Sequence, residues 1–138
     1  MPLKLEQADQ IISGVLSHAR ETDAKPLAVM VLDSGGHPVA FRRQDGCSLF
    51  RHDIARAKAM TALGMGIDSR EIATRAANNP VFFGSLSAVT GGDLVLSAGG
   101  VLIRDEQGDI LGAVGISGDT PDVDESCAQA GIAAANLK

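Results

Sequence analysis

The apolar positions at the start of the chain follow a helical period. From residue 5 to about residue 21, apolar side chains recur every three to four positions, while polar side chains take the other side. The apolar positions are Ala8, Ile11, Ile12, Val15, Leu16 and Ala19. This spacing predicts an amphipathic helix, which the polar segment from Thr22 to Pro26 ends.

Two pairs of apolar segments, one near each end of the chain, have the pattern of β-hairpins. Residues 27–33 and 38–43 flank one polar turn, and residues 100–104 and 110–117 flank another. In each turn an aspartate stands three residues before a glycine, Asp33 before Gly36 and Asp105 before Gly108. This spacing is typical of a type I turn with glycine at a positive φ. The two hairpins predict a mainly antiparallel sheet.

The segment between the hairpins reads mostly as helix. A helix is expected from Ser48 to about Leu63 and a shorter one from Asp68 until Asn78. Residues 80–93 mix apolar side chains with glycine and serine, so we expect an irregular segment, followed by a short strand over 94–97. A last helix begins at Pro121, with Thr120 as N-cap, and runs to about residue 136. The order of elements predicts an α+β domain in which helices cover the faces of a mainly antiparallel sheet.

Composition narrows the class of protein. With 138 residues, 45% of them hydrophobic, we expect one domain over residues 1–138. The net charge of −5 gives no basic surface for nucleic acid, and the apolar runs are too short to span a membrane. The N-terminus lacks the apolar core of a signal peptide, so we expect a cytoplasmic protein. The spacing of cysteines and histidines predicts no metal site.

Several side chains are candidates for acid–base chemistry. Lys58 borders an apolar helix face, where it either extends to solvent or pairs, partly buried, with Asp53 or a bound carboxylate. His52, Asp33 and Asp119 complete the candidate catalytic set. These residues leave open an enzyme, such as an isomerase, tautomerase or lyase acting on a small organic acid.

A second set of residues predicts a small-molecule site. Glycines and a serine leave adjacent strands with small side chains or none, and this opens room for a ligand or for the last helix. Apolar residues of the irregular segment are expected to line that room, and an arginine to pair with a carboxylate of the ligand. The candidate ligand-binding residues are Arg42, Phe82, Phe83, Leu86, Gly99, Gly100, Gly115 and Ser117.

Five sequence motifs, in order, carry a family resemblance. They span residues 31–46, 53–62, 98–103, 112–120 and 124–128. Together they resemble the GlcG/HbpS family of haem-binding and haem-degradation-associated proteins, which includes the C-terminal domain of PduO corrinoid adenosyltransferases. The resemblance implies a profilin-like α/β/α sandwich with a five-stranded antiparallel sheet, usually assembled into oligomers. Asp119 departs from the family pattern, which has a further glycine there.

The resemblance makes a small-molecule-binding protein the leading hypothesis. Haem or a related tetrapyrrole is the expected ligand, in an accessory, sensor or haem-handling role, and a homo-oligomer is the expected assembly. His18, His37 and His52 are the histidines available to iron. A catabolic enzyme stays open as an alternative. So does an oligomeric accessory protein without a ligand, in which Ala55, Ala59 and Ala62 would be subunit contacts.

Overall fold

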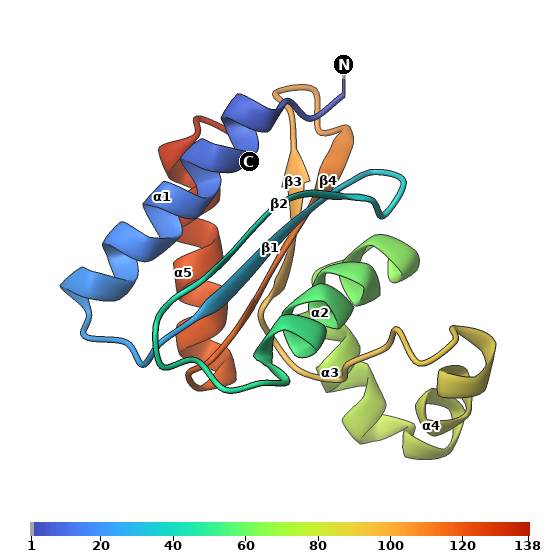
Figure 1. Ribbon diagram of the computed structural model, residues 1–138. Coiled ribbons are helices and arrows are strands. Elements are labelled where there is room, and N and C mark those ends of the chain that lie inside the picture. The colour runs from blue at the N-terminus through green and yellow to red at the C-terminus, as the bar shows by residue number, and fades with distance from the viewer. Residues whose placement is uncertain (1) are drawn as a thin grey trace.

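The computed structural model describes residues 2–138 and contains one antiparallel sheet (Figure 1). Its strands are β1 (Ala28–Asp33), β2 (Pro38–Arg43), β3 (Gly100–Arg104) and β4 (Ile110–Ser117). The strand order is β2-β1-β4-β3, so the two hairpins meet through a central β1–β4 pair. The two predicted hairpins are confirmed, with turn glycines Gly36 and Gly108 at positive φ.

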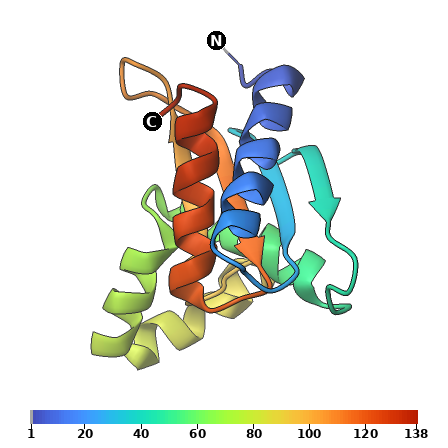
Figure 2. The same cartoon turned by 90° about the vertical axis from the view of Figure 1, so that its left-hand side faces the viewer.

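Helices cover both faces of the sheet. On one face, α1 (Leu5–Glu21) and α5 (Pro121–Ala134) lie side by side, as Figure 2 shows. On the other face lies α2 (Arg51–Met65), followed by α3 (Ser69–Asn78) and α4 (Pro80–Val89), which extends away from the sheet (Figure 1). The α+β architecture with helices flanking an antiparallel sheet therefore agrees with the sequence. No helix among residues 2–138 is long and apolar enough to cross a membrane.

The central strand β1 is apolar at nearly every position because both of its faces are covered. Val29 and Val31 pack toward α1 and α5, while Met30 and Leu32 pack toward α2. This alternation follows from the two-residue period of a strand. A strand buried on both faces therefore reads as a continuous apolar run rather than as an alternating one.

Glycines in β3 and β4 let the backbone of α2 lie close against the sheet. The space that they leave is therefore filled by α2, and not by the last helix or an open cavity. A Cβ on Gly115 would lie 1.9 Å from the carbonyl oxygen of Ala55, and one on Gly100 would lie 2.0 Å from that of Lys58. The backbone of α2 thus rests directly on β3 and β4, and Ala55, Ala59 and Ala62 are buried against the sheet. The hypothesis that this alanine stripe is a subunit contact is wrong, because the chain's own sheet covers it.

Two further predictions are wrong within residues 80–97. The sheet has four strands, not five, because residues 94–97 find no strand partner. Their backbone is held by α2 instead: Val95 N–H donates to Thr61 Oγ1 at 2.9 Å. Residues 80–89 form α4 rather than an irregular segment, since Pro80 starts the helix and Phe83 packs on Ile72 of α3.

Candidate functional site

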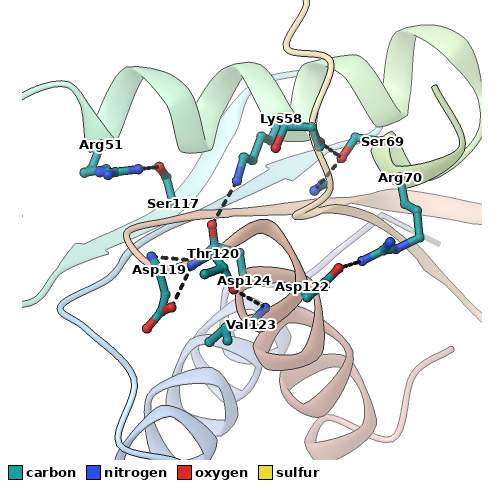
Figure 3. A network of polar contacts seen from close by, with 12 residues as sticks. Arg51, Lys58, Ser69, Arg70, Ser117, Asp119, Thr120, Asp122, Val123 and Asp124 are labelled. Carbon is teal, nitrogen blue, oxygen red and sulfur yellow. Dashed lines mark hydrogen bonds and ion pairs between the residues drawn. The ribbon is translucent and has the colours of Figure 1, made fainter. Parts of the chain in front are cut away.

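A buried ion pair joins α2 to the start of α5. Lys58 Nζ lies 2.9 Å from Asp124 Oδ2, and the two side chains are only 4% and 1% exposed (Figure 3). Two of the alternatives expected for Lys58, extension to solvent and a pair with Asp53, are wrong, because Lys58 is buried against Asp124. Asp53 is exposed, and its Oδ1 lies 3.5 Å from His52 Nδ1.

The ammonium reaches Asp124 from the opposite layer past Gly99, the residue directly before β3. A Cβ on Gly99 would lie 2.8 Å from Lys58 Nζ, so a side chain there would block the lysine. Asp124 Oδ1 accepts from the backbone N–H of Asp119 at 3.1 Å, which fixes the carboxylate on both oxygens. Burial raises the pKa of Asp124, and the neighbouring Lys58 ammonium opposes that rise. The pair locks α2 to the β4–α5 connection and is closed to solvent.

The two remaining candidate aspartates hold turns. Asp119 Oδ2 accepts from Lys25 N–H and Oδ1 accepts from Thr120 N–H, both at 2.7 Å. These backbone hydrogen bonds, that of Lys25 first, lower the pKa of Asp119. Asp33 accepts from the backbone of His37 and Gly35, and the His37 bond contributes most to lowering the pKa of Asp33. Both carboxylates are thus occupied by backbone donors, which are local for Asp33 and include the distant Lys25 for Asp119.

The five candidate acid–base groups do not surround one cavity. Lys58 is buried, Asp33 and Asp119 are in turns, and His52 packs edge-on against Phe41 with ring centroids 4.7 Å apart. Five cavities among residues 2–138 are lined without any of these five groups. These five groups therefore do not form the shared acid–base site that the enzyme hypothesis predicts.

The aromatic ligand-binding candidates belong to a small core between α3 and α4. Phe83 is buried, with Leu86 packed beside the cluster that it forms with Ile72. Phe82 is half-exposed and meets Phe83 edge-on at 5.2 Å. Ser117 accepts from Arg51 Nη1 at 3.1 Å (Figure 3). Neither these four residues nor the strand glycines line any of the five cavities.

Two cavities do contain chemistry suited to a ligand. Arg42 lines a cavity of about 610 Å³ near the end of β2, together with Arg20 and Arg43. His18, half-buried on α1, lines a cavity of about 220 Å³ with Val123 of α5. It is the only histidine in residues 2–138 that lines one of the five cavities, and its Nε2 lies 3.2 Å from Ser126 Oγ. Within residues 2–138, no cluster of three or more His, Cys, Asp or Glu is placed to hold a metal ion.

Comparisons with known proteins agree on one family. The chain is 26% identical over 138 residues to the corrinoid adenosyltransferase PduO of Citrobacter freundii, covering all of this chain and 40% of that protein. It is 32% identical over 120 residues to the protein GlcG of Escherichia coli K12, covering 85% of each. A crystal structure of a PduOC–haem complex superposes with a TM-score of 0.89 at 25% identity, covering 100% of this chain and 98% of that one.

The chain thus spans about two fifths of the PduO protein that it matches, and most of GlcG. The model of the family described as "Haem degrading protein HbpS-like" matches residues 3–133, which is nearly all of the chain. The chain therefore belongs to the HbpS-like family.

Proposed function

We propose that this protein binds haem or a related tetrapyrrole, in an accessory, sensor or haem-handling role. The observation that carries the proposal is the chain-long similarity to the PduOC–haem complex, at a TM-score of 0.89. Membership of a family described as haem-degrading supports the same ligand. An adenosyltransferase activity is not part of the proposal, because this chain matches only 40% of the PduO length.

His18 is the residue that we propose as the iron ligand. A histidine imidazole is a common axial ligand of haem iron, and His18 offers one beside apolar Val123 in a cavity between α1 and α5. The contact with Ser126 Oγ orients the ring, as hydrogen-bond partners of metal-binding histidines do. His37 is exposed in a turn and pairs with Asp33, and His52 packs on Phe41.

The cavity at His18 encloses a ligand only in part. Its volume of about 220 Å³ is below the roughly 300–1,000 Å³ of pockets that bury a drug-sized molecule. A flat tetrapyrrole at His18 would therefore extend over the surface of α1 and α5. We propose that a second copy of the chain covers the outer face, in the homo-oligomer that the family resemblance implies.

The test is a titration of the purified protein with hemin, followed by the Soret band. We expect a saturable Soret shift at one hemin per chain, lost in His18→Ala and kept in His37→Ala and His52→Ala. The two other histidine variants are matched controls because they remove the same ring elsewhere. The absence of a Soret shift in the unmodified protein would remove the haem assignment, and a shift lost only in His52→Ala or His37→Ala would remove His18.

A further inference from the structure

Three arginine side chains line one cavity near the end of β2, and neither the buried ion pair nor the proposed haem site uses them. We propose that the cavity lined by Arg20, Arg42 and Arg43, here called the arginine cavity, binds a small organic acid with two carboxylates. This inference is independent of haem binding at His18. The residues Arg20 and His18 are two apart on α1, so their side chains leave the helix in widely different directions.

The hydrogen bonds of the arginines single out this cavity. Five of the eight arginines donate a side-chain hydrogen bond to a protein oxygen within residues 2–138, namely Arg51, Arg56, Arg70, Arg75 and Arg104. The three that make no such bond there are the three that line the arginine cavity. Guanidinium groups are strong hydrogen-bond donors, and their geometry matches that of a carboxylate. Three guanidinium groups that lack protein acceptors and line one cavity are therefore suited to bind an anionic ligand.

Charge and lining define the class of ligand. The cavity wall carries three guanidiniums and one carboxylate, that of Asp45, which leaves two net positive charges on a chain of net charge −5. A dianion neutralises that excess. Leu16 and Pro26 add apolar wall, which favours an organic acid over inorganic phosphate. The volume of about 610 Å³ accommodates a small molecule of this kind.

Arg42 already has a weak internal competitor for the ligand. Asp9 Oδ1 lies 3.7 Å from Arg42 Nη2, beyond hydrogen-bond distance, and both side chains are about half exposed. Asp9, Leu16 and Arg20 share one face of α1, at i, i+7 and i+11. The Asp9 carboxylate is therefore only a weak partner of Arg42. A bound dicarboxylate displaces Asp9 and takes its place beside the guanidinium.

The test uses succinate, glutarate and adipate as probes, with butyrate as the monocarboxylate control, in calorimetric titrations at low salt. We expect saturable binding of at least one dicarboxylate and at least tenfold weaker binding of butyrate. Arg20→Gln and Arg42→Gln each weaken the binding about tenfold, since a hydrogen bond to a charged group is worth this much or more. Asp9→Asn tightens it severalfold because the competing carboxylate is gone. Arg75→Gln, which removes an exposed arginine on α3, is the matched control and leaves affinity unchanged.

Two outcomes would overturn the proposal that the arginine cavity binds a dicarboxylate. One is the lack of saturable dicarboxylate binding at millimolar concentrations, and the other is binding that Arg20→Gln and Arg42→Gln leave unchanged. Hemin and its dimethyl ester distinguish a free acid from the propionates of a tetrapyrrole. If the ester binds as tightly as hemin while succinate-type probes bind at the cavity, the ligand there is a free acid. A Soret shift kept in Arg20→Gln shows that haem binding stands whatever becomes of the cavity.

Discussion

Breaking the buried Lys58–Asp124 pair should strongly destabilise the fold at neutral pH. The variant Lys58→Met keeps most of the lysine stem and removes only the ammonium. Asp124 then stays buried with no cation 2.9 Å away, although Asp119 N–H still donates to it. Removing one partner of a buried pair typically costs about 3–5 kcal/mol.

This cost is large against the stability of a chain of 138 residues. Domains are typically stable by about 5–15 kcal/mol, so Lys58→Met removes at least about a fifth of that margin. At roughly 3–5 °C per kcal/mol for this size, Tm falls by about 9–25 °C. The exposed pair Arg75–Glu71, at 3.0 Å, provides the control, and Arg75→Met costs less than about 0.5 kcal/mol.

A double variant separates loss of charge balance from loss of packing. In Lys58→Met with Asp124→Asn, the amide oxygen still accepts from Asp119 N–H while the buried charge is gone. Urea unfolding at pH 7 should therefore show the double variant to be more stable than Lys58→Met alone. A Lys58→Met cost below about 1 kcal/mol, or a double variant less stable than the single one, would refute the reasoning.

The pH dependence has a definite sign. Burial raises the pKa of Asp124 in the folded protein, and removing Lys58 raises it further, because the ammonium opposes the rise. A raised folded pKa contributes stability that is present below the unfolded value near 3.8 and is lost as pH rises through the folded pKa. The stability gap between Lys58→Met and the double variant should therefore close as pH falls from 7 toward 4. A gap that widens over that range would contradict this assignment.

Two further predictions concern glycine packing and cysteine reactivity. Gly115→Ala should lower the free energy of unfolding, measured in urea, by more than the roughly 1–3 kcal/mol typical of an overpacked core, because the added Cβ meets the α2 backbone. Gly64→Ala, at an open position in a helix, should raise the free energy of unfolding by up to about 1 kcal/mol. Equal effects of the two substitutions would contradict the close approach of α2. Burial raises the pKa of the Cys127 thiol to about 11. A thiol reagent at pH 8 should therefore modify the half-buried Cys47 first. Rapid modification of both cysteines in the folded protein would show that Cys127 is not enclosed.

Local patterns were enough to predict most of the fold. The apolar run of β1, the two aspartate–glycine turns and the cap at Thr120 each depend on residues close together in the sequence. The errors occur where the local pattern is ambiguous. Residues 80–89 contain no charged residue and little helical period, and their helix depends on Phe83 packing against α3. Residues 94–97 look like a strand, but the place beside β3 stays without a partner.

The candidate site was harder to predict because it depends on contacts between distant elements. Lys58 was identified by its place on an apolar helix face, yet its partner Asp124 lies on α5, on the other side of the sheet. Gly99 was the available signal, although nothing local shows that it makes room for a lysine side chain. Arg42 was expected to meet an acidic group, and the structure places it in a cavity with Arg20, which comes from another element.

The most direct test of haem binding through His18 is imidazole rescue in the visible spectrum. His18→Gly mixed with one equivalent of hemin should lack the Soret shift of the unmodified protein, and added imidazole should restore it, because the free ring replaces the missing ligand beside Val123. The same treatment of His52→Gly should change nothing. A Soret spectrum of His18→Gly identical to that of the unmodified protein, before imidazole is added, would contradict the account.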